Sequence, residues 1–100
     1  MKDYKIKTLA ENIFASDRSC IFSRVIEISA NRFKVTQEAG NCFSRTRIYI
    51  MLPTRTWEVV ADEDDIGECY INYVSGEATK KREMDRIYGR AVDYIIKVFL

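Results

Sequence analysis

The sequence contains no histidine, and its three cysteines, Cys20, Cys42 and Cys69, lie far apart with no Cys-x-x-Cys pair. A structural zinc site usually needs four Cys or His ligands, so this composition excludes the common zinc-binding classes. Histidine is also the commonest general base, and its absence removes the most frequent acid–base chemistry. Each cysteine lies in a strand-like stretch, which favours a reduced, half-buried thiol over a redox or nucleophilic role.

Glycine is scarce as well. The four glycines, Gly40, Gly67, Gly76 and Gly89, are too scattered to build a phosphate-binding loop. No Gly-x-Ser-x-Gly nucleophile motif is present. The paired carboxylates lie in a polar segment, where desolvation would not raise a pKa. The sequence therefore predicts a protein that is not an enzyme and that holds no cofactor or metal.

Long apolar runs are also missing, and the longest, residues 48–52, is far shorter than a membrane span. The first residues are charged and lack the apolar region of a signal peptide, so we expect a cytoplasmic protein without membrane contact. A hydrophobic share of 47% and a charged share of 31% are typical of a globular chain. A length of 100 residues suits one domain over residues 1–100.

The pattern of apolar residues predicts an α+β fold. Spacings of three and four favour an N-terminal helix over residues 3–15, on the evidence of Ile6, Leu9, Ala10, Ile13 and Phe14. The alternative is an early strand through Tyr4, Ile6 and Thr8. Alternation and turn signals predict strands over residues 20–29, 33–38, 42–52, 56–61 and 68–74. A long apolar stripe predicts a helix over residues 77–99.

Short connections between these strands favour a five-stranded antiparallel meander, with both helices packed on one face of the sheet. A turn is expected at Ala30-Asn31-Arg32, where Asn31 is able to take the left-handed conformation. Gly89 lies inside the C-terminal helix, where it is interpreted as a point of close approach to the sheet.

The strand over residues 42–52 carries the main candidate for function. Side chains alternate along a strand, so Phe43, Arg45, Arg47 and Tyr49 share one face. Two arginines on a strand are expensive to bury without partners, so this face is expected to be exposed. Its aromatic and arginine side chains are the types enriched in protein interfaces, and they are also the types that bind single-stranded RNA.

Four consecutive carboxylates form a second candidate: Asp62, Glu63, Asp64 and Asp65. An EF-hand beginning at Asp62 fails, because Ile66 and Tyr73 would occupy ligand positions. A solvated acidic loop is the simpler interpretation, and a mimic of a phosphate backbone that binds a basic partner is the sharper one. Arg82, Arg86 and Arg90, spaced by four along the last helix, are interpreted as a solvated basic ridge.

Three functions stay open for the chain: binding of a protein or ribonucleoprotein, binding of single-stranded RNA, and formation of a homodimer. The net charge is only +1, so a protein or ribonucleoprotein partner is favoured over nucleic acid alone. The structural alternative is that Glu38, Glu58 or Glu68 simply pairs with the strand arginines. A homodimer through the apolar end of the last helix, residues 92–100, is a further possibility.

In its length and its lack of catalytic motifs, the chain resembles the small single-domain proteins of phages and mobile elements, such as anti-CRISPR and other anti-defence proteins. This is a resemblance of size and style, and it covers no specific residue. It implies an inhibitor that occludes a host protein or ribonucleoprotein complex.

Overall fold

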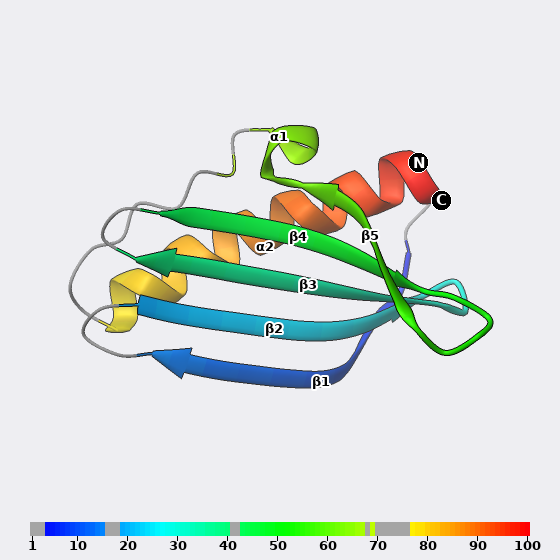
Figure 1. Cartoon of the computed structure of the whole chain (residues 1–100), viewed down its shortest axis with the longest axis horizontal. Coiled ribbons are helices and arrows are strands. Elements are labelled where there is room, and N and C mark those ends of the chain that lie inside the picture. The colour runs from blue at the N-terminus through cyan, green and yellow to red at the C-terminus, as the bar shows by residue number, and fades with distance from the viewer. Residues whose placement is uncertain (1–3, 16–18, 41–42, 68, 70–76) are drawn as a thin grey trace.

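The computed structural model describes residues 4–15, 19–40, 43–67, 69 and 77–100. Its elements follow the chain in the order β1 (Ile6–Ala15), β2 (Ser19–Ile28), β3 (Asn31–Gly40), β4 (Ser44–Met51), β5 (Trp57–Asp62), α1 (Glu63–Ile66) and α2 (Glu77–Phe99). The five strands form one antiparallel sheet in which each strand pairs with the next along the chain. The long helix α2 crosses one face of this sheet diagonally (Figure 1). The predicted antiparallel meander and C-terminal helix are therefore confirmed.

The predicted N-terminal helix over residues 3–15 is wrong, because this segment forms strand β1. It pairs with β2 from Ile6 opposite Ile28 to Ala15 opposite Cys20, with a bulge between Thr8 and Ala10. The bulge shifts the alternation by one residue, which is why the apolar spacing imitates a helix. The predicted strand over residues 68–74 lies outside the described residues except for Cys69, which is in no strand.

The turn between β2 and β3 differs by one residue from the expected one. Ile28 pairs with Asn31, so Ser29 and Ala30 form a two-residue loop, and both have positive φ, 52° and 66°. Positive φ at both positions is the geometry of a type I′ hairpin turn. The side-chain amide of Asn31 donates a hydrogen bond to the backbone carbonyl of Ser29 at 3.3 Å. Asn31 therefore does not take the left-handed conformation, which Ala30 has instead.

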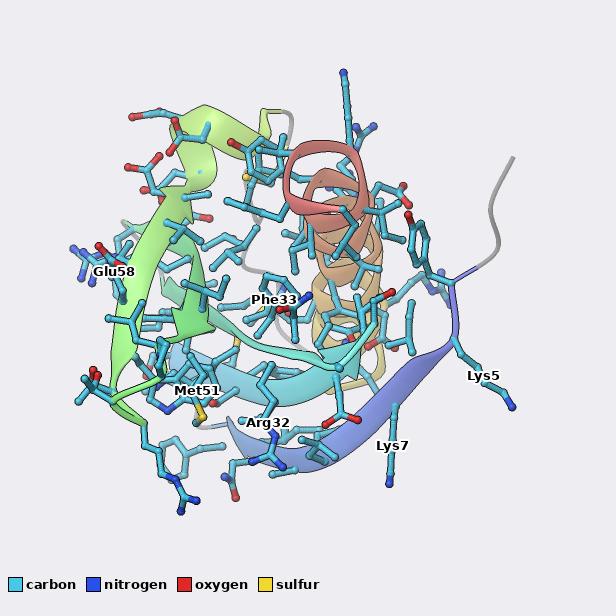
Figure 2. The ribbon with its side chains drawn as sticks, turned by 90° about the vertical axis from the view of Figure 1, so that its right-hand side faces the viewer. Lys5, Lys7, Arg32, Phe33, Met51 and Glu58 are labelled. Atoms are coloured by element: carbon cyan, nitrogen blue, oxygen red, sulfur yellow. The ribbon has the colours of Figure 1, made fainter. Side chains whose placement is uncertain are left out.

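The core lies between the sheet and α2. Ile26, Phe33 and Ile48 from three neighbouring strands are fully buried, as is Ile95 of the helix. Figure 2 shows Phe33 pointing into this layer. The predicted apolar stripe of α2 is confirmed at Met84, Ile87, Ala91 and Ile95, which are buried together with Val92, whereas Val98 and Phe99 at its end are exposed. Gly89 is exposed, and a methyl group added there would meet no atom within 4 Å, so its interpretation as a close approach is wrong.

Candidate binding surface on the open face of the sheet

Strand β4 presents its two faces as predicted. Thr46 and Ile48 are buried toward α2, whereas Arg45 is exposed and Arg47 and Tyr49 are half-buried on the opposite side. No described element covers that opposite side, which we call the open face (Figure 1). Alternation along the strand and packing of α2 on one side together produce this division.

Phe43 lies just outside β4 and is 48% exposed. Its carbonyl accepts a hydrogen bond from the backbone N–H of Gly40 at 2.9 Å, which closes the connection from β3. The backbone contact therefore fixes the main chain of Phe43 next to the start of β4.

The register of the sheet shows which residues surround the arginines. On β3, Glu38, Thr36 and Lys34 lie opposite Arg45, Arg47 and Tyr49 respectively. On β5, Val59 lies opposite Tyr49, and Trp57 lies opposite Met51. Directly opposed residues share a face, so these side chains extend the open face across three strands.

An aromatic pair on this face surrounds a lysine. The ammonium of Lys34 lies 4.6 Å from the ring centre of Tyr49 and 5.0 Å from that of Trp57. Both distances are within the range of a cation–π interaction. The lysine therefore covers one face of each ring, a face on which a nucleotide base could otherwise stack.

The strand arginines lack ionic partners in the described chain. Glu38 lies directly opposite Arg45, yet no described carboxylate forms an ion pair with Arg45 or Arg47. Glu58 lies opposite Ile50, and it therefore belongs to the other face. The predicted pairing with Glu38 or Glu58 is thus not found, and Glu68 lies outside the described residues.

The open face as a whole is more basic than acidic. From the registers, it carries five basic and three acidic positions: Lys7, Arg32, Lys34, Arg45, Arg47, Glu27, Glu38 and Asp62. Figure 2 shows Lys7, Arg32 and Met51 pointing away from α2. Arg32 and Glu27 form an ion pair at 3.5 Å, and Glu38 and Asp62 lie opposite Arg45 and Arg47, so the excess of two positive charges is spread over the face.

An open hollow of about 620 Å³ lies at one end of this face. Ala30, Asn31, Arg32, Met51 and Arg55 line it. Arg55 has a positive φ of 64° in the connection between β4 and β5, a conformation that nothing in the sequence indicated. The hollow was therefore not predicted.

The four consecutive carboxylates do not form the predicted loop. They initiate the one-turn helix α1, in which Asp62 is the N-cap. The Asp62 carboxylate accepts from the N–H groups of Asp64 at 2.9 Å and Asp65 at 3.2 Å. The Asp65 carboxylate accepts in return from the N–H of Asp62 at 3.0 Å. This reciprocal capping box satisfies backbone donors that would otherwise lack partners.

Glu63 is likewise used within the fold. Its carboxylate accepts a hydrogen bond from the N–H of Thr46 at 3.3 Å, and its carbonyl accepts one from the thiol of Cys69, also at 3.3 Å. Asp65 and Ile66 line a hollow of about 280 Å³ together with residues of α2, including Arg90 and Lys97. The acidic turn therefore lies beside α2 and next to β4, where Asp62 is directly opposite Arg47, although no described carboxylate forms an ion pair with that arginine.

The two described cysteines, Cys20 and Cys69, are buried and reduced. Burial is the main cause that raises the pKa of Cys69, and the nearby charge of Glu63 raises it further. A raised pKa disfavours the nucleophilic thiolate. Among the residues that the structure describes, no three Cys, Asp or Glu side chains are arranged to hold a metal ion.

The basic ridge of α2 is partly neutralised. Arg86 forms an ion pair with Glu83 at 2.9 Å, and Lys81 forms one with Asp85 at 2.9 Å. Arg82 and Arg90 are exposed. These contacts support the interpretation of a solvated helix face.

The end of α2 that was considered for a homodimer is largely used in the core. Val92 and Ile95 are buried, and Phe99 lies 6.1 Å from the ring of Phe33 and from that of Tyr94. Two large apolar side chains remain exposed there, Val98 at 51% and Phe99 at 36%.

Comparison with known proteins adds no assignment: no family model matches the chain, and neither a curated protein nor a solved structure matches it significantly. In the described part of the chain, neither helix combines the length and the apolar character that a membrane span requires.

Proposed function

We propose that this chain is a small non-enzymatic protein-binding module that contacts a protein or ribonucleoprotein partner through the open face of its sheet. One observation carries the proposal: Arg45 and Arg47 project from a paired strand on an uncovered face, without an ionic partner among the described residues. Arginine, tyrosine and tryptophan are the residues most enriched among binding hot spots, and Tyr49 and Trp57 lie on the same face. Side chains on a paired strand also lose less conformational freedom on binding than loop residues do.

Apolar positions beside the charged ones support a protein partner. Met51 is half-buried, and Val59 is 51% exposed, opposite Tyr49. A mixture of apolar and arginine side chains matches the anatomy of protein interfaces, which combine a water-excluding centre with a polar rim. The excess of basic positions favours an acidic surface on the partner.

The test compares proteins captured from the native host by three forms of the chain. The open-face variant is Arg45→Ala with Arg47→Ala, and the matched control is Arg82→Ala with Lys97→Ala, which removes the same charge from exposed positions of α2. A partner retained by the wild type and the control but lost by the open-face variant supports the proposal. Capture of the same proteins by all three forms contradicts it.

Binding kinetics on the captured partner then separate the two charged surfaces. The open-face variant should mainly raise the dissociation rate, with a loss of about 1–2 kcal/mol. Asp64→Asn on the exposed acidic turn should instead mainly slow association, and only at low ionic strength. The reverse pattern would assign binding to the acidic turn.

A single-stranded RNA-binding function is the second candidate, favoured by the excess of basic positions on the open face. A titration with a single-stranded oligoribonucleotide over a salt series tests it. The logarithm of the affinity should fall with the logarithm of salt concentration at a slope of about −0.7 for each phosphate contact. Absence of binding at low salt would exclude this function.

A further inference from the structure

Strand β1 forms one edge of the sheet, and its outer side pairs with no strand in the described chain. The described part of the chain has nine exposed large hydrophobic side chains, and four of them lie on this one strand: Ile6, Leu9, Ile13 and Phe14, with exposed fractions of 42%, 37%, 47% and 63%. An unpaired edge presents a row of backbone N–H and C=O groups that another strand can extend. A ten-residue edge with exposed apolar side chains is thus suited to strand pairing.

The opposite edge of the sheet is built differently. Strand β5 has only six residues against ten in β1, and the pairing of each edge strand with its neighbour has one irregularity, so length separates the two edges. It leads directly into α1, which is held to β4 by the hydrogen bond between Thr46 and Glu63. Short edges that lead into a helix are protected against unwanted pairing. This contrast points to β1 as the edge available for a partner.

Exposed apolar side chains occur on both sides of β1, and the register with β2 assigns them. Ile6 and Ile13 lie opposite Ile28 and Phe22, so both are on the side that faces α2. Phe14 lies opposite Ile21 on the open face. Leu9 is the extra residue at the bulge. A single strand added to this edge therefore has to contact apolar groups on both faces of the sheet.

We propose that the partner of this edge is a second copy of the chain, with the two β1 strands paired antiparallel about a two-fold axis at Ala10. Leu9, the extra residue at the bulge, is left out of the pairing on both strands. With Leu9 left out, the two residues of every pair lie on the same face of the sheet along the whole strand. This register places Ala10 against Ala10, Glu11 against Thr8, Asn12 against Lys7 and Ile13 against Ile6 of the second copy.

The chemistry of β1 is self-complementary in this register. The two isoleucines on the α2 side meet each other across the axis, and the smallest side chain, Ala10, lies where the strands approach on the axis itself. Lys7 and Glu11 never face a like charge. If the two-fold axis lay one residue further along, at Glu11, the two Glu11 side chains would face each other. Like charges directly opposite destabilise a sheet. The dimer has a continuous ten-stranded sheet with both α2 helices on one side, an isologous interface.

The first test measures the mass of the chain in solution over a concentration series by sedimentation equilibrium. The wild type should pass from monomer to dimer. Ile13→Lys, which places a charge against Ile6, should stay monomeric at concentrations where the wild type is a dimer. Val59→Lys is the matched control at an equally exposed position of β5, and it should dimerise like the wild type.

A wild type that is monomeric at every concentration overturns the proposal and leaves the edge for another protein's strand. An Ile13→Lys variant that still dimerises also overturns the proposal. A Val59→Lys variant that fails to dimerise overturns it as well. If Ile13→Lys fails to fold, Phe14→Lys, at the most exposed of these positions, replaces it.

The second test fixes the register with a short bismaleimide crosslinker in a Cys42→Ser background. Directly opposed Cβ atoms are about 5 Å apart, so Ala10→Cys should crosslink efficiently between copies. In Asn12→Cys, the two thiols would be four residues apart along the strands, about 14 Å, and should crosslink poorly. Equal crosslinking of the two variants, or preference for Asn12→Cys, contradicts pairing about Ala10.

Discussion

The guanidinium of Arg24 on β2 donates a hydrogen bond to the carboxylate of Asp85 on α2. Arg24 is only 6% exposed, and it lies 4.2 Å from the ring centre of Tyr88. Glu11 of β1 approaches the same guanidinium at 3.9 Å. One buried charge thus connects the edge strand, its neighbour and the helix.

Asp85→Asn should lower the free energy of unfolding by about 2 kcal/mol. Removal of one partner of a buried pair typically costs about 3–5 kcal/mol, and the exposure of Asp85 reduces this figure. Urea unfolding at neutral pH measures the effect. Asp93→Asn, at an exposed carboxylate of the same helix, is the control. Equal losses in the two variants would show that the Arg24 contact contributes nothing specific.

The same pair predicts a dependence of stability on pH. Partial burial alone would raise the pKa of Asp85, but hydrogen bonds and charge from Lys81 and Arg24 outweigh it and hold the pKa below its ordinary value of 3.8. The stabilisation is therefore complete above pH 3.8 and is lost as the pH falls through the folded-state pKa. The difference in unfolding free energy between wild type and Asp85→Asn should shrink over that acidic range. A constant difference down to pH 2 would contradict this.

Gly89→Ala should raise the free energy of unfolding by about 1 kcal/mol. Glycine inside a helix is less favourable than alanine by roughly that amount, and the added methyl group meets no neighbouring atom. Gly67→Ala is an informative contrast, because Gly67 has a φ of 76° at the end of α1. We expect the latter change to lower the melting temperature. Thermal unfolding of both variants checks the opposite signs.

Ala30→Gly should stabilise the hairpin between β2 and β3 by about 0.5–1 kcal/mol. An L-residue in the left-handed region is strained by about 1–2 kcal/mol, and the greater flexibility of glycine in the unfolded chain offsets part of the gain. Ala10→Gly, at a position without positive φ, should be destabilising. Chemical denaturation of both variants is the measurement, and a loss of stability at position 30 would argue against the type I′ turn.

Cys69 should resist alkylation by iodoacetamide at pH 8 while the protein is folded. Its burial, its raised pKa and its hydrogen bond to Glu63 all disfavour the thiolate. Peptide mapping by mass spectrometry after timed labelling should find Cys20 and Cys69 modified only in urea. Labelling of native Cys69 at the rate of a free thiol would show that the region around α1 opens readily.

Alternation made the faces of β4 predictable. Thr46 and Ile48 turn toward the helix and Arg45 turns away, because a period of two is a local property of the strand. The interaction of Lys34 with Tyr49 and Trp57 was not predictable, because it depends on pairing register across three strands.

Strand β1 was mistaken for a helix for an identifiable physical reason. A bulge at Leu9 moves Ile13 to the side of Ile6, seven residues away, a separation that also fits two turns of a helix. The segment offered no clear helix cap, and its pairing with the β-branched residues of β2 decided the outcome. The acidic turn had a readable signal, since an acidic residue three positions after Asp62 is the pattern of a capping box.

The pairing of each strand with its successor sets the order in which the chain can fold during synthesis. Hairpins between neighbouring segments close only short loops, so they form early at little entropic cost. Residues 77–99 leave the ribosome after the five strands, and they supply the helix that covers Ile26, Phe33 and Ile48. The nascent chain therefore carries a paired sheet with a bare apolar face until α2 emerges, and this is the stage at which we expect a chaperone to bind it.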